Sequence, residues 1–292
     1  MKTIKIAITV DDLPYHGSCI SDEEKYADVI NFLDILNNKK IAGIYGFING
    51  KSIEEEYNLK KILDLWKYNG HKLGNHTYSH LDLRDTSSSL FINDILLNEP
   101  ILKEFYSQED LKFFRYPFLL EGETSEKRDS IRNFLDKNNY KIAQCTVDFR
   151  DFSFNNILIL AEKKRNKKII DEIRNLFIES SIYRINAAIK FSNYLFKRDI
   201  KHILLLHMCH ITSTFFGDVI DAYKKIGCEF IPLEEAIEDD IYKTNPNLIT
   251  DKGMDFLSQT WNSRKIPYID MPPLPITLSG LNAMEKSLKE EN

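Results

Sequence analysis

Short apolar runs alternate with amphipathic stretches along most of the chain. The apolar runs predict β-strands at residues 4–10, 41–47, 112–116, 140–147, 202–206 and 228–231. The amphipathic stretches between them predict helices at residues 22–36, 53–66, 87–105, 125–138 and 218–225. Strands that alternate with helices favour a parallel sheet, and this number of repeats favours a TIM-barrel-like α/β fold.

A single barrel would occupy most of the chain, which has 292 residues. We expect a distorted (β/α)7 barrel over residues 1–240. Residues 153–199, rich in Lys, Asn and Ile, predict a helical insertion that packs outside this barrel. The proline-rich run at residues 266–275 breaks regular structure, so residues 241–292 predict a peripheral helical tail and not a second catalytic domain.

Composition and charge narrow the classes of partner. With 43% hydrophobic and 28% charged residues, the chain fits a soluble globular protein with a sizeable core. Its net charge of -5 gives no reason to expect nucleic acid or an anionic membrane as a partner. The first apolar run is too short for a signal peptide, and no run approaches the ~20 residues of a membrane span. We therefore expect a cytoplasmic protein, and the sequence leaves its oligomeric state open.

Ionisable residues gather at the carboxyl ends of several predicted strands. They are Asp11 and Asp12 after the first strand, Arg115 in the third, Asp148 and Asp151 after the fourth, and His207 after the fifth. Active sites of α/β barrels are built at this face, so we expect these side chains to converge there.

A second candidate is the H-x-x-x-H pair of His76 and His80. On a helical turn, residues four apart share a face with Cβ atoms ~5–6 Å apart, which lets two imidazoles reach one metal ion. A catalytic zinc site needs a third protein ligand and an open position for water. An aspartate from the end of the first strand would be that third ligand.

Five segments together resemble the motifs of the polysaccharide deacetylase family (NodB-homology domains, carbohydrate esterase family 4). They are residues 9–14 (TVDDLP), 76–80 (HTYSH), 115–118 (RYPF), 148–152 (DFRDF) and 205–207 (LLH). The corresponding family patterns are TFDDGP, H[ST]xxH, RxP[YF]G, DxxDW and LxH. All five occur in the family's order, so residues 1–240 are identified as a NodB-like deacetylase barrel.

The resemblance implies a metal site and a general base. Asp12, His76 and His80 would bind one divalent ion, zinc first, with Co²⁺, Ni²⁺ or Mn²⁺ as alternatives. Asp11 would be the base that deprotonates the attacking water, and Arg115 would hold Asp11 ionised and oriented. A metal that lowers the pKa of water toward ~7 makes a carboxylate a sufficient base.

The resemblance also implies a general acid and a substrate site. His207 would protonate the leaving amine, and Asp151 would orient and support His207. An amide leaves badly as an anion, so an acid with a pKa near the working pH is needed. The backbone N–H of Phe118 would help to bind the oxyanion, and Tyr116 and Leu205 would contact the substrate.

The chain departs from the family patterns at three positions. Leu13 and Leu119 stand where the family has glycine, and Phe152 stands where it has tryptophan. These changes put the shape of the groove in doubt, and hence the substrate. The remaining histidines at positions 16, 71, 202 and 210 are expected to be surface or packed residues, with His210 noted for its closeness to His207.

Three functions are compatible with these residues. The first is a metal-dependent N-deacetylase acting on an acetylated amino sugar or related carbohydrate. The second is a family-related hydrolase of a small non-sugar amide, such as a formamide or a cyclic amide. The third is an inactive carbohydrate-binding barrel, which would not need both an acid and a base.

Overall fold

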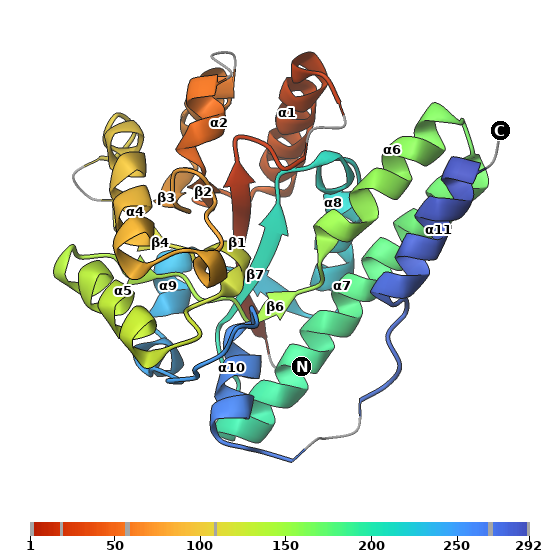
Figure 1. The fold of residues 1–292 in the computed structure, drawn as a ribbon. Coiled ribbons are helices and arrows are strands. Elements are labelled where there is room, and N and C mark those ends of the chain that lie inside the picture. The colour runs from red at the N-terminus through yellow and green to blue at the C-terminus, as the bar shows by residue number, and fades with distance from the viewer. Residues whose placement is uncertain (1–2, 18–19, 56–58, 108–109, 268–270, 291–292) are drawn as a thin grey trace.

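The computed structural model describes the chain except for residues 1–2, 18–19, 56–58, 108–109, 268–270 and 291–292. Eight parallel strands form one sheet in the order β5-β4-β3-β2-β1-β7-β6, with β8 paired to the start of β1 (Figure 1). The strands are β1 (Ile4–Leu13), β2 (Tyr45–Ile48), β3 (Lys72–Asn75), β4 (Phe113–Phe114), β5 (Lys141–Ile142), β6 (Val147–Asp148), β7 (His202–His207) and β8 (Cys228–Phe230). The sheet curls into a distorted barrel, which confirms the predicted fold.

Helices that follow the strands cover the outside of the sheet (Figure 1). They are α1 (Asp22–Lys39), α2 (Gly50–Glu55), α3 (Lys60–Tyr68), α4 (Ser88–Lys103), α5 (Ser125–Lys137) and α8 (His210–Lys225). Helix α9 (Leu233–Ile237) instead packs Leu233 and Ala236 into the apolar cluster inside the barrel. Helix α1 begins with a capping box, in which the Ser21 hydroxyl accepts from the Glu24 N–H and the Glu24 carboxylate accepts from the Ser21 N–H.

Alternating residues of β1 contribute to two separate cores. Ile6 and Ile8 belong to the main hydrophobic core between the sheet and the helices. Ala7 belongs to a smaller apolar cluster inside the barrel, and Thr9 and Asp11 continue that inward face. Because side chains alternate along the strand, Asp11 faces the inside of the barrel at the end of β1, while the opposite face of β1 packs in the main core.

The barrel closes through one short segment, residues 140–148. Its first half forms β5 against β4, and its second half forms β6 against β7. Between them, the Ala143 N–H donates to Phe114 O at 2.8 Å, and the Thr146 N–H donates to Ile203 O at 2.9 Å. The sequence predicts one strand here. The segment forms two instead, because it must pair with two different neighbours, and this change of partner distorts the barrel.

Two other elements differ from their predictions for physical reasons. Strand β3 is not predicted, because Lys72, Gly74 and Asn75 have low β-propensity, and its pairing with β2 overrides that preference. Helix α8 begins at His210, eight residues before its predicted start, and passes through Gly217. Glycine in a helix costs ~1 kcal/mol relative to alanine, and the burial of neighbours such as Phe216 offsets this cost.

The insertion is helical, as the sequence predicts. Helices α6 (Asn155–Lys163) and α7 (Lys167–Phe196) run beside α8 on the outside of the barrel (Figure 1). The tail contains α10 (Phe256–Ser263) and α11 (Leu278–Glu290), and α11 packs against α6. Within the described residues, no helix combines the length and the apolar character needed to cross a bilayer.

Part of the tail packs against the barrel and is not peripheral. The Met254 N–H donates to Leu119 O at 3.2 Å, and the Phe256 N–H donates to Cys145 O at 2.8 Å. Phe256 is fully buried. These bonds tie the tail to the loop after β4 and to the segment that closes the barrel, which corrects the expectation of a peripheral tail over residues 250–256. Residues 268–270 of the proline-rich run lie outside the described residues.

The tail approaches the loop after β4 most closely at Gly253, so a larger residue at this position should destabilise the protein. A Cβ on Gly253 would lie 1.8 Å from the carbonyl oxygen of Phe118, so Gly253→Ala must displace backbone. We expect a loss of ~1–3 kcal/mol in the free energy of unfolding, measured by urea denaturation. The control is Gly217→Ala, whose Cβ would meet Ile35 Cγ2 at 3.5 Å, an ordinary contact. Equal stabilities for the two variants would contradict this packing of the tail.

Candidate metal and acid–base site

Asp11 and Asp12 lie at the carboxyl end of β1, where the strand loses its regular geometry. The register between β1 and β2 shifts between Val10 and Leu13, and Asp12 has a φ of 61°. A regular strand sends adjacent side chains to opposite faces. Here both carboxylates approach His76, whose Nε2 lies 3.9 Å from Asp11 Oδ2 and 3.3 Å from Asp12 Oδ1.

His76 and His80 lie in the loop after β3 and not on the helical turn expected from their spacing. Thr77 and His80 have φ values of 64° and 53°, which are excluded from a right-handed helix. The two rings nevertheless approach each other, with 5.0 Å between their centroids. The pair is therefore brought together by a folded loop, and the helical argument for it is wrong.

Three polar side chains fix the backbone of this loop. Asn49 Nδ2 donates to the carbonyl oxygen of residue 76 at 2.8 Å. Asn75 Oδ1 accepts from the N–H of residue 77 at 2.9 Å, and Asp94 Oδ2 accepts from the N–H of residue 79 at 2.9 Å. Such side-chain bonds replace the helical ones and stabilise the left-handed residues. None of the three is apparent from the sequence, because their partners are backbone atoms.

The side chains of Asp12, His76 and His80 have a geometry that fits a metal ion. Asp12 Oδ1 lies 3.3 Å from His76 Nε2 and 3.4 Å from His80 Nε2. Ligand atoms bound ~2.0–2.1 Å from a tetrahedral zinc ion lie ~3.4 Å apart, so both separations suit one ion. Asp12 Oδ1 is also buried without a hydrogen-bond partner among the described residues. A buried, unpaired carboxylate oxygen is costly, and a cation would remove that cost.

The protonation states of these groups also suit a metal. His76 Nδ1 lies 2.8 Å from Arg115 O, so Nδ1 carries the proton and Nε2 is left as the ligand atom. Burial lowers the pKa of His80 to about 4, which keeps its imidazole neutral. Burial alone would raise the pKa of Asp12, but the hydrogen bond with His16 and the close approach of His76 and His80 hold it well below its usual range. An ionised carboxylate and neutral imidazoles are the forms that bind metals.

Arg115 and Asp11 form an ion pair inside the barrel. Arg115 Nη1 lies 3.3 Å from Asp11 Oδ2, and the two side chains are 1% and 3% exposed. Arg115 Nη2 also donates to Thr9 Oγ1 at 2.9 Å, and its Nε donates to Ala143 O. Buried charges are tolerated when they are paired and hydrogen-bonded, so this set holds the Asp11 carboxylate in one orientation.

His207 and Asp151 form a second buried pair. Asp151 is fully buried, and its Oδ1 lies 2.7 Å from His207 Nδ1. Its Oδ2 accepts from the His207 N–H at 2.6 Å and from Thr212 Oγ1 at 3.0 Å. Burial alone would lower the pKa of His207, but the charge and hydrogen bond of Asp151 raise it to about 10. Asp148 lies near this pair, and its Oδ1 accepts from the N–H of Arg150.

Two aromatic rings flank the histidines and remain accessible. Phe118 is 50% exposed and packs edge-on against His80, with ring centroids 4.5 Å apart. Phe152 is 39% exposed and packs edge-on against His207 at 4.9 Å. Exposed aromatic faces beside polar groups suit the apolar faces of a sugar ring or of another small substrate.

Part of the chain is similar in sequence to known polysaccharide deacetylases. Residues 1–143 match the sequence model of the polysaccharide deacetylase family. The family resemblance is confirmed. A peptidoglycan-N-acetylglucosamine deacetylase of Bacillus cereus is 28% identical over 148 residues, which are 51% of this chain and 46% of the relative. The match thus spans less than half the length of that deacetylase.

Solved structures of a deacetylase and of a pseudoenzyme have the same fold. The chitin deacetylase of the fungal pathogen Colletotrichum lindemuthianum aligns with a TM-score of 0.53 and 20% identity, over 86% of this chain and 92% of the other. A CE4 family pseudoenzyme from Bacillus anthracis aligns with a TM-score of 0.54 and 14% identity, over 81% and 66%. Because this fold includes a pseudoenzyme, activity has to be argued from the residues of the site.

The departures from the deacetylase motifs have different consequences. Leu13 is buried, and a Cβ on Gly46 would lie 2.0 Å from its Cδ1, so Leu13 fills core space and does not narrow the groove. Leu119 has a φ of 53°, a left-handed conformation that explains the glycine of the family pattern. Phe152 keeps an aromatic ring at the tryptophan position, beside His207.

Two predicted substrate residues are buried. The side chain of Tyr116 is 2% exposed and packs against Phe91 and Phe114, so a substrate contact could come only from its main chain. Leu205 is 3% exposed and precedes His207 by two residues, on the same face of β7. Its contact with substrate stays a prediction.

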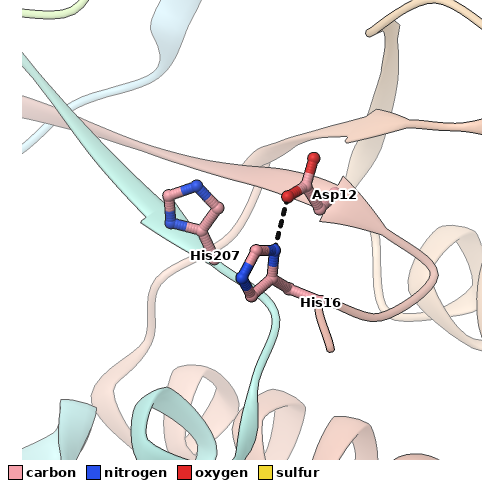
Figure 2. Close-up of side chains that lie close together, drawn as sticks. All are labelled: Asp12, His16 and His207. Atoms are coloured by element: carbon pink, nitrogen blue, oxygen red, sulfur yellow. Dashed lines mark hydrogen bonds and ion pairs between the residues drawn. The ribbon is translucent and has the colours of Figure 1, made fainter. Parts of the chain in front are cut away.

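His16 belongs to the site, although sequence alone assigns it to packing or to the surface. Its Nδ1 lies 2.6 Å from Asp12 Oδ2, and its ring centroid lies 4.9 Å from that of His207 (Figure 2). Asp12 therefore faces His76 and His80 with one oxygen and His16 with the other. Asp12, His16 and His207 form a second possible ligand group, but Asp151 already engages His207 Nδ1. The only sequence signal for His16 is its position four residues after Asp12.

The geometry predicts one divalent ion per chain, bound by Asp12, His76 and His80. We expect His80→Ala to lower zinc affinity at least ~10-fold, because one of three protein ligands is lost. His210→Gln is the control, since His210 bonds Asp28 and Glu162 and lies outside both ligand groups. Metal content after dialysis against limiting zinc measures the difference. Full occupancy of the His80 variant would reject the site.

Proposed function

We propose that the protein is a metal-dependent hydrolase that removes an N-acetyl group from an amino sugar or a related carbohydrate. The observation that carries the proposal is the placement of a metal-ligand set between two supported acid–base groups, Asp11 and His207. A binding protein needs neither a base nor an acid. The similarity of residues 1–143 to polysaccharide deacetylases supports the reaction and the substrate class.

The ligand set suits a cation of intermediate hardness. Asp12, His76 and His80 offer one oxygen and two nitrogen atoms, a combination found with Zn²⁺ and accessible to Co²⁺, Ni²⁺ and Mn²⁺. When bound, such an ion supplies a Lewis acid for the amide carbonyl and lowers the pKa of water. The chain holds the His76 ring for this purpose with the Arg115 carbonyl, and it holds Asp12 with His16.

Asp11 is the proposed general base. Its Oδ2 lies 3.9 Å from His76 Nε2, so a water molecule held at the ligand set would lie beside it. Arg115 pairs with the carboxylate and orients it, so that it accepts a proton from the attacking water. General-base assistance of this kind contributes ~10²–10⁴-fold to the rate.

His207 is the proposed general acid. Asp151 engages Nδ1, so Nε2 is the ring atom that can donate a proton to the leaving nitrogen. The backbone N–H of Phe118 is proposed to stabilise the oxyanion, a contribution worth ~3–4 kcal/mol in comparable sites. Phe118 and Phe152 would flank the substrate.

A small non-sugar amide is the alternative substrate, and an inactive barrel is the alternative function. The likeness to a CE4 pseudoenzyme gives the second alternative weight. Against it, Asp11, Asp12, His76, His80 and His207 are all present, and each acid–base group has its own buried partner.

If His207 is the general acid, His207→Ala should slow the hydrolysis of an amide far more than the hydrolysis of an aryl ester. An amide nitrogen must be protonated before it leaves, whereas an aryl oxygen leaves as a stable anion. We expect ~10²–10⁴-fold loss of kcat on an N-acetylated sugar oligomer and ~10-fold loss or less on p-nitrophenyl acetate. Thermal melting checks that the variant is folded. Equal losses on both substrates would remove His207 as the acid.

Asp151→Asn gives the matching pH prediction. A general acid works while protonated, so the rate falls as the pH rises through the pKa of His207. Asp151 raises that pKa, and loss of its charge lowers it. The alkaline limb of the kcat profile should therefore move to lower pH in Asp151→Asn, with the metal content unchanged. An unmoved alkaline limb would show that His207 does not set it.

A further inference from the structure

A cavity of about 410 Å³ lies outside the barrel, between residues 149–154, helix α7 and the start of α11. None of the proposed catalytic or metal-binding residues lines it. In Figure 1, α11 runs beside α6 and α7, so the cavity is walled by the insertion and the tail. Tyr183 Oη donates to Pro272 O at 2.8 Å and fixes the tail to α7 near the cavity. The volume is within the range of small-molecule sites, ~300–1,000 Å³.

Two arginines line this cavity. Arg150 is exposed and Arg184 is half-buried, and neither guanidinium forms a hydrogen bond or ion pair with any described residue. Asp255 acts on Arg184 through its charge, but its carboxylate accepts from the N–H and hydroxyl of Ser258. Each guanidinium offers five N–H donors in a planar fork that matches phosphate and carboxylate oxygens.

Ser180 provides independent evidence for a ligand. It lies on α7 and lines the cavity, its side chain is 8% exposed, and its hydroxyl has no hydrogen-bond partner among the described residues. A buried hydroxyl without a partner costs ~1–3 kcal/mol. Rotation of the Ser180 side chain about χ1 toward the cavity would let the hydroxyl donate to an oxygen atom of a ligand and remove that cost.

The amino end of α11 adds a third donor group. Thr277 caps the helix, because its hydroxyl accepts from the Gly280 N–H at 3.1 Å, and Leu278 and Ser279 of the first turn line the cavity. The first N–H groups of a helix lack helical partners and carry a partial positive charge. Helix α11 has 13 residues, long enough for this effect.

We propose that this cavity is a binding site for a small anionic molecule, one that carries a phosphate or a carboxylate. Arg184 and Arg150 supply positive charge, Ser180 supplies a buried hydroxyl, and α11 supplies its amino end. The cavity is made from the insertion and the tail, so the site is a property of this chain and does not depend on the deacetylase reaction. Phe149 and Arg150 directly precede Asp151, so the bound anion touches the segment that orients His207.

Calorimetric titration with inorganic phosphate at low ionic strength tests the proposal. Glucuronate, titrated in parallel, shows whether a carboxylate is bound as well as a phosphate. We expect saturable phosphate binding by the wild type and at least ~10-fold weaker binding by Arg184→Met, because a charge-assisted hydrogen bond is lost. The control is Arg174→Met on the same helix, where Arg174 pairs with Asp218 at 2.7 Å and lies away from the cavity.

Ser180→Ala separates a specific site from general positive charge. The variant keeps every charge, and alanine is favoured in a helix, so the fold should be retained. We expect several-fold weaker phosphate binding. Absence of saturable binding by the wild type, or equal affinities in Arg184→Met and Arg174→Met, would overturn the proposal. Either result would leave the deacetylase assignment untouched, because no residue of the metal or acid–base site is altered.

Discussion

The candidate site depends on backbone conformations that cost free energy. Asp12, Thr77, His80 and Phe118 have φ values of 61°, 64°, 53° and 56°. Each left-handed residue other than glycine costs roughly 1–3 kcal/mol unless its surroundings stabilise it. Three of these four positions supply a proposed metal ligand or oxyanion donor. The barrel and its loops therefore maintain conformations that a short peptide would not adopt.

Buried polar contacts offset this strain and connect distant segments. Arg115 joins Asp11 on β1 to the backbone of Ala143 in the closing segment and, through its carbonyl, to His76. Asp151 joins the insertion boundary to β7 and α8 through His207 and Thr212. Each charge is paired, so the groups cannot relax independently of one another. The tail takes part as well, since residues 253 and 254 contact the loop of Phe118.

Much of the fold and of the candidate site could be predicted from the sequence, for reasons that differ between residues. The strand ends identified Asp11, Asp12 and His207, because parallel strands place their carboxyl ends on one face. The pair of His76 and His80 was identifiable from its motif, although the helical geometry inferred from its spacing is wrong. His16 could not be found, because its role follows from a loop that folds back onto Asp12. Strand β3 and the inner packing of the tail depend on tertiary contacts that local propensity does not contain.

The central claim is that these residues hydrolyse an amide with the help of a bound metal. The direct measurement is acetate and formate release from a panel of N-acetylated amino sugars, their oligomers and small amides. Chelator-treated protein is compared with the same protein after addition of one equivalent of zinc, and Asp11→Asn is carried through as a metal-binding but base-deficient control. The account predicts acetate release from at least one N-acetylated sugar, dependent on zinc and reduced ~10²–10⁴-fold in the control. Absence of acetate and formate release from every compound, with zinc bound stoichiometrically, would contradict it and indicate a pseudoenzyme.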